Sequence, residues 1–317
     1  MTIATLIGPV EFLSNFTFRT MLVGTALVGG FSGALGCFLY LRKQSLIADV
    51  IGHSAIAGVM GAFVFATAIV GVDGRSMLVL TIGATISATA SVIFAQWITH
   101  HSQLTMDAAM AISLALFYGI GMVALRAIVH SSLPNRGGID KYMFGNAATL
   151  TNEDLLTIAI FGGGALLIVL IGWKAFKVFT FDPILAQMLG FSPRATSLIL
   201  AGATTIAVVI GVKSAGLILM VAFAIMPAAS ARQWTKRLSH MVGLATAIGA
   251  GSGVVGSYLA VNLGKVPTGP VIVLVLFTVF LISLGFAPER SVIRRYFMRR
   301  AKMRALRAQA YSEALGA

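Results

Sequence analysis

Two residues suited to chemistry lie inside an apolar stretch of the chain. Asp49 and His53 interrupt the segment SLIADVIGHSAIAGVMGAF, residues 45–63, and are spaced four residues apart. On a helix this spacing puts both side chains on one face, with their Cβ atoms about 5–6 Å apart. A carboxylate oxygen and an imidazole nitrogen together suit divalent ions such as Mn²⁺, Fe²⁺ or Zn²⁺. The pair is therefore a candidate metal site.

Three interpretations of this Asp–His pair are open from its residues alone. The side chains can bond to each other and fix a helix interface, they can relay protons, or they can bind a metal ion. We favour metal binding in transit, because two ligands hold an ion weakly enough for it to leave again. A catalytic metal centre would need further ligands and a base, and the chain has no second D-x-x-x-H and no H-E-x-x-H motif.

The composition is that of a membrane-embedded protein. Hydrophobic residues make up 58% of the 317 residues and charged residues only 10%, whereas a soluble domain carries about 25% charged residues. We therefore expect an all-α, polytopic membrane helical bundle. Ionisable groups facing lipid cost about 2.5–3.5 kcal/mol or more, so Asp49 and His53 should face the bundle interior or a water-filled path. A helix beginning near Gln44 would put His53 roughly 14 Å deep, near mid-membrane.

The apolar runs predict about nine transmembrane helices, each close to the roughly 20 residues that a bilayer requires. Their ranges are 19–40, 44–68, 76–98, 106–129, 155–173, 195–212, 215–231, 242–263 and 269–287. Sixteen of the 23 Lys and Arg residues then lie on one side, which the positive-inside rule assigns to the cytoplasm. The N-terminus is accordingly predicted outside and the C-terminus in the cytoplasm.

This topology divides the chain into three parts. Residues 1–18 form an N-terminal extracytoplasmic segment, residues 19–287 the transmembrane domain, and residues 288–317 a basic cytoplasmic tail. The net charge of +13 is concentrated on the cytoplasmic side, so we expect contact with anionic membrane lipid and not with nucleic acid. The single cysteine, Cys37, excludes an intramolecular disulfide.

A short segment on the predicted cytoplasmic side, FDPILAQMLGF, carries the signals of its own helix. Asp182 suits the N-cap, Pro183 the first helical position and Gly190 the position after the C-cap. The apolar residues between them are Ile184, Leu185, Met188 and Leu189. Such a helix either rests on lipid or docks into a groove of a partner protein.

The sixth and seventh predicted spans are short and separated only by Lys213 and Ser214, so they form either a tight hairpin or partly broken helices. The seventh contains the stretch AGLILMVAFAIMPAASARQ. Pro227 in this stretch should kink or end the helix, and the small residues after it permit close approach of neighbouring backbones.

At three places the chain resembles the permease subunits of bacterial ABC transporters for manganese, zinc and iron. The segment LRKQSLIADVIGHSAIAGVMGAF is similar to the family's second-helix segment with its Asp–His pair. FDPILAQMLGFSPR resembles the family's coupling segment, and AGLILMVAFAIMPAASARQ resembles its G-x-L-L…P-A-A-x-A segment. The order and spacing of the three match over roughly residues 19–287.

The resemblance implies that Asp49 and His53 line a translocation path for manganese, or for zinc or iron, in the bacterial inner membrane. Residues Asp182 to Gly190 would form a coupling helix seated on a separate ATP-binding cassette subunit. A periplasmic or lipoprotein metal-binding protein would deliver the ion, and a second copy or a paralogous permease would complete a dimer. This chain would itself be no enzyme and would bind no cofactor, because ATP is bound and hydrolysed by the partner subunit.

A different class of function also fits the Asp–His pair. A proton-coupled secondary transporter would use Asp49 and His53 as a relay and would work without an ATPase. The long predicted outer loop favours, among the metal transporters, the manganese and iron branch.

Overall fold

The structure is a computed structural model. It describes residues 8, 12, 14–44, 46–71, 74, 76–131, 134, 147–264 and 266–287. The basic tail predicted for residues 288–317, most of the long outer loop and most of the N-terminal segment lie outside these described residues.

The described residues form helices and no strand. These are α2 (Phe16–Leu41), α3 (Leu46–Val64), the π-helix η1 (Phe65–Val70), α4 (Met77–His101), α5 (Met106–His130), the 3₁₀ turn η3 (Ala147–Thr149), α6 (Asn152–Ile171), α7 (Trp173–Phe181), α8 (Pro183–Met188), α9 (Pro193–Ala215), α10 (Leu217–Trp234), α11 (Leu238–Asn262) and α12 (Thr268–Phe286). The predicted all-α bundle is confirmed for this part of the chain.

Each of the nine predicted spans coincides with a helix. Within the described ranges, eight helical segments are long and apolar enough to cross a membrane. The ninth, α10, holds 18 residues, contains Pro227 and has Arg232 in its last turn; it is not among the eight. Length and composition therefore support eight crossings directly.

The boundary between the sixth and seventh spans differs from the prediction. Lys213 and Ser214 belong to α9, and the chain turns instead at Gly216, whose φ of 79° suits a residue without a side chain. Pro227 does not end its helix either, because α10 continues to Trp234. The proline packs against the backbone of α2, where a Cβ on Gly33 would lie 3.2 Å from the Cβ of Pro227.

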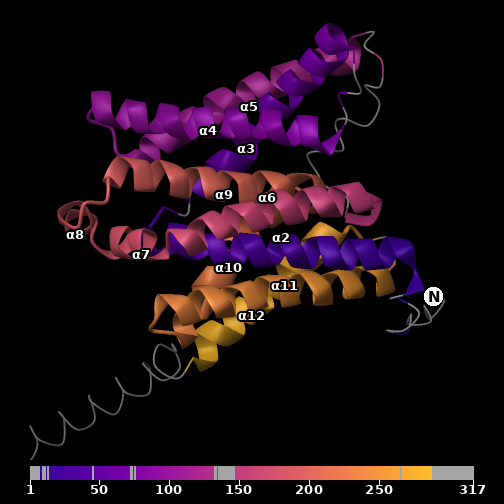
Figure 1. Ribbon diagram of the computed structural model, residues 1–317. Helices are drawn as coiled ribbons and strands as arrows, with labels where there is room; N and C mark the ends of the chain where they lie inside the picture. Colours follow the sequence, from indigo (N-terminus) through magenta and orange to yellow (C-terminus); the bar gives the residue numbers. More distant parts are fainter. Residues whose placement is uncertain are drawn as a thin grey trace, which may run out of the picture.

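The helices form three groups in space (Figure 1). Helices α3, α4 and α5 lie on one side, α10, α11 and α12 on the other, and α2, α6 and α9 between them. Glycines allow α2 to approach its neighbours closely. A Cβ on Gly249 of α11 would collide with the carbonyl oxygen of Gly29, and one on Gly36 would collide with that of Ala224. In a membrane such close backbone contact replaces the hydrophobic drive of a soluble core.

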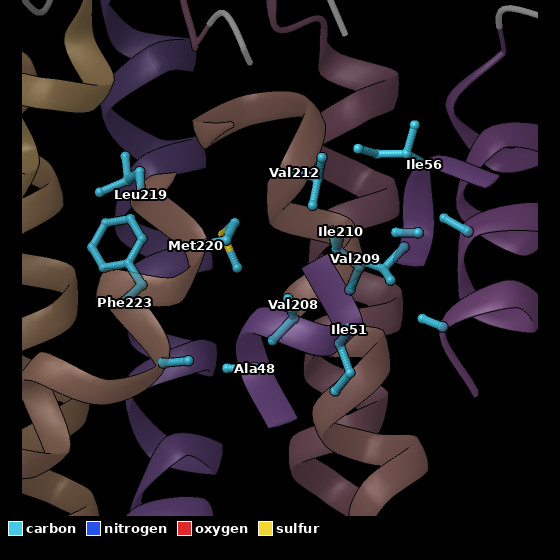
Figure 2. Packing of buried hydrophobic residues seen from close by; sticks show 14 of the residues in the cluster. Ala48, Ile51, Ile56, Val208, Val209, Ile210, Val212, Leu219, Met220 and Phe223 are labelled. Carbon is cyan, nitrogen blue, oxygen red and sulfur yellow. The ribbon is translucent and has the colours of Figure 1, made fainter. Parts of the chain in front are cut away.

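Helix α3 packs against α9 of the middle group and against α10 (Figure 2). Its residues Ala48 and Ile51 pack near Val208 of α9, and Met220 and Phe223 of α10 belong to the same buried cluster. All five side chains are at most 1% exposed. The apolar face of α3 therefore fixes the direction in which its opposite, polar face points.

Candidate metal site and coupling segment

Asp49 and His53 are in direct contact on α3. The His53 Nε2 and Asp49 Oδ1 atoms are 3.3 Å apart, and their side chains are 32% and 36% exposed. The helix begins at Leu46 and not near Gln44, so Asp49 lies in its first turn, where a carboxylate is favoured by the helix dipole. His53 is then only roughly 10 Å along the helix from its start, which is shallower than the sequence predicts.

The spacing of the two ligand atoms fits one divalent ion. With metal–ligand bonds of about 2.1 Å, atoms 3.3 Å apart subtend about 100° at the ion, between octahedral and tetrahedral values. Across the described residues, no third His, Cys, Asp or Glu joins them in a cluster. This chain therefore offers an ion two adjacent ligands on a partly open face, with room for others from water or another molecule.

Tyr118 of α5 is a neighbour of the pair that the sequence reasoning missed. Its ring meets the His53 imidazole edge to face, with centroids 5.3 Å apart and planes at 90°. The His53 Nδ1 atom is buried and has no hydrogen-bond partner, so the ring contact, and not a second hydrogen bond, orients the far side of the imidazole. No local pattern could have identified Tyr118, which lies 65 residues further along the chain.

A chain of serines ties α3 to the two helices beside it. The Ser54 and Ser91 hydroxyls are 2.7 Å apart, and those of Ser91 and Ser113 are 2.9 Å apart. All three side chains are fully buried. Ser87 also donates to the Ser54 carbonyl oxygen over 2.8 Å. Because Ser54 follows His53 directly, these bonds fix the rotation of α3 at the site.

The predicted coupling segment forms the short helix α8, which projects at one end of the bundle (Figure 1). The Asp182 carboxylate accepts hydrogen bonds of 3.0 Å from the amides of Ile184 and Leu185. At the other end, Gly190 has φ 86° and its amide bonds to Gln187. Each of the predicted helix signals is thus realised.

The apolar side chains of α8 are exposed on the surface of this chain. Ile184, Leu185, Met188 and Leu189 are 73%, 44%, 81% and 57% exposed. Only Ala186 is buried. A helix of six residues is far too short to span a bilayer, so these side chains either meet lipid headgroups or a partner protein.

Comparison with known proteins shows the family of this chain. A model of the family described as the ABC 3 transport family matches residues 14–287. The chain belongs to the ABC 3 transport family. The resemblance predicted from the three motifs is confirmed, and the family match includes α3 with the Asp–His pair and α8.

Relatives named for metal transport are similar over most of this chain. The zinc transport system membrane protein TroC of Treponema pallidum is 34% identical over 92% of this chain and 95% of its own length. The manganese transport system membrane protein MntC of Bacillus subtilis is 37% identical over 86% of this chain, which spans 61% of that relative.

A solved structure shares the fold of this ABC 3 family chain. It is PsaBC from Streptococcus pneumoniae in complex with Fab, with a TM-score of 0.78 and 28% identity over 90% of this chain and 98% of the matched one. Since the match extends over most of this chain and nearly all of the matched one, the two share the helical arrangement seen in Figure 1.

Proposed function

We propose that this chain is the membrane-spanning permease subunit of an ATP-driven importer of divalent transition-metal ions, most specifically manganese. The observation that carries the proposal is the Asp49–His53 contact of 3.3 Å on α3, a helix that packs against α9 and α10. Ionisable groups are costly where they face lipid, so within a membrane domain they mark a water-filled path or an ion pathway. Relatives named for manganese and zinc transport support the same reading.

In this proposal, Asp49 and His53 bind the metal ion briefly during its passage. A metal ion would replace the Asp49–His53 contact by one bond to each side chain, with its remaining positions filled by water or by the counterpart residues of a second permease. Because the described residues of this chain supply only two ligands, we expect it to hold the ion weakly enough for the ion to move on. Tyr118 and the serine chain keep both ligands in place between passages.

The remaining parts of the proposed importer are separate proteins. The exposed apolar face of α8 suits the groove of an ATP-binding cassette subunit, which would bind and hydrolyse ATP. A second permease, identical or paralogous, would cover the partly exposed ligand pair. A periplasmic or lipoprotein metal-binding protein would deliver the ion from outside, with α8 and the C-terminus on the cytoplasmic side of the bacterial inner membrane.

Manganese is proposed ahead of zinc and iron as the cargo. An oxygen ligand beside one imidazole suits the harder Mn²⁺ as well as Zn²⁺ and Fe²⁺. The manganese transport protein of Streptococcus gordonii, ScaB, is a further relative, 30% identical over 90% of this chain. A probable iron transport protein of Haemophilus influenzae is 28% identical.

Metal uptake into vesicles tests the proposal. The chain, its ATPase and the binding protein are reconstituted, and ⁵⁴Mn²⁺ uptake is measured with and without ATP against competing Zn²⁺ and Fe²⁺. We expect ATP-dependent uptake that Asp49→Ala and His53→Ala each reduce at least about tenfold, since each removes one of two ligands, while ATPase co-purification is retained. Uptake without any ATPase would instead establish a secondary transporter, and normal uptake by both variants would refute the transit site.

A further inference from the structure

Arg42, at the end of α2, contacts the segment that leads into the coupling helix. Its guanidinium carbon lies 4.4 Å from the centroid of the Phe179 ring of α7, well inside the range of a cation–π contact. Phe179 is 3% exposed. Burial lowers the pKa of the Arg42 guanidinium, which still remains protonated because arginine begins so far above neutrality.

The turn that carries Arg42 is rigid and leads directly into the metal site. The Lys43 amide donates to Tyr40 over 3.1 Å and the Gln44 amide to Leu39 over 3.0 Å. Lys43 adopts φ 56°, the left-handed geometry that such a helix end requires and that glycine usually supplies. The Ile47 amide bonds to the Gln44 carbonyl oxygen over 3.0 Å, which joins this turn to the first residues of α3.

On its other side, α7 is held by aromatic contacts and continues into α8. Phe38 of α2 meets Trp173 and Phe176 of α7 edge to face, with centroids 6.0 and 6.5 Å apart. Asp182 is both the end of α7 and the N-cap of α8. A displacement of α8 therefore moves α7 and reaches the ring of Phe179.

We propose that the Arg42–Phe179 contact transmits movement of the coupling segment to the Asp49–His53 pair. The inference rests on the proposed function, since it assigns a role within ATP-driven transport. Arg42 touches no ion; it acts by joining α7 to the turn from which the metal-binding helix begins. Loss of the contact should leave the rate of ATP hydrolysis unchanged. It should lower the number of ions moved for each ATP hydrolysed.

The test is the number of ions moved per ATP hydrolysed by the reconstituted complex. Arg42→Gln removes the cation and Phe179→Leu removes the ring. Each should lower the ratio about fivefold or more, the usual lower range for coupling between sites, with little change in ATPase rate or co-purification. The double variant should be no worse than either single one, because both remove the same contact. Arg42→Lys, which keeps a cation, should recover part of the ratio.

Lys43→Gln is the matched control, since it removes a positive charge from the same turn without touching Phe179. It should keep the parent ratio. An unchanged ratio in Arg42→Gln, an equal fall in Lys43→Gln, or additive effects in the double variant would overturn the inference. If Arg42→Gln fails to assemble, Phe179→Leu decides in the same way. A parent complex that moves no metal would refute the proposed function itself, independently of these comparisons.

Discussion

At the scale of single residues, the candidate metal site is positioned by contacts between different helices. Asp49 and His53 come from one helix and one sequence motif, but the imidazole is oriented by Tyr118 from α5. The next residue, Ser54, is fixed by Ser91 and Ser113. Two neighbouring helices thus hold the Asp49–His53 pair in position. The geometry of the pair therefore depends on residues that are not themselves candidate ligands.

Tyr118→Leu should weaken metal binding without preventing assembly. An aromatic pair contributes about 0.5–1.5 kcal/mol beyond its buried area, so we expect the KM for Mn²⁺ uptake to rise about two- to tenfold. Tyr118→Phe keeps the ring and should behave like the parent. The measurement is uptake rate against Mn²⁺ concentration, and equal KM values for the Leu and Phe variants would contradict a positioning role.

At the scale of elements, α7 and α8 form one segment at one end of the bundle, joined at Asp182. The aromatic face of α7 is buried against α2, whereas the apolar face of α8 is exposed. The sharp change at Asp182 arises because its carboxylate caps α8 and stops α7 from continuing. One part of the segment is therefore anchored in the membrane domain, and the other is free to engage a partner.

Met188→Glu should disrupt association with the ATPase subunit. Met188 is 81% exposed, and burying a carboxylate in an apolar groove without a partner is strongly unfavourable. We expect co-purification of the ATPase to fall about tenfold, the effect of losing a moderate interface anchor. Met188→Leu preserves the apolar surface and serves as the control. Undiminished co-purification of the Glu variant would favour a helix that rests on lipid.

At the scale of the whole molecule, glycine contacts join α2 to α10 and α11, while polar contacts join α3 to α4 and α5. Between Gly29 and Gly249 the backbones of two helices touch. The serine chain on the other side closes α3 against its neighbours. Close backbone contact is not confined to α2, because a Cβ on Gly58 of α3 would collide with the Gly83 carbonyl oxygen of α4. Helix α3 is therefore held by close backbone approach and by hydroxyl hydrogen bonds together.

Gly249→Ala should destabilise the bundle, because the added Cβ would collide with the Gly29 carbonyl oxygen and the helices would have to separate. Overpacking of this kind costs about 1–3 kcal/mol, seen as a lower thermal unfolding temperature in detergent. Gly251→Ala on the same helix meets open space and is the matched control. Equal unfolding temperatures for the two variants would show that the helices adjust without cost.

Much of the fold follows from local rules that can be read along the sequence. Apolar runs predict nine helices close to their observed places. Asp182, Pro183 and Gly190 define α8, because capping and turn geometry depend only on neighbouring residues. The four-residue spacing of Asp49 and His53 likewise determines their contact, since an α-helix repeats every 3.6 residues.

Other features were decided only by the tertiary structure. Pro227 lies within a helix that continues to Trp234, so the alternative that the helix ends at this proline was wrong. Tyr118 contacts His53, and Ser91 bonds to Ser54, from helices distant in sequence. Phe179 meets Arg42 across 137 positions of chain. Such contacts depend on how helices pack and rotate against one another. Local residue patterns do not determine this packing. The sequence alone therefore determined the Asp49–His53 pair, and the tertiary structure determined which residues hold the pair in position.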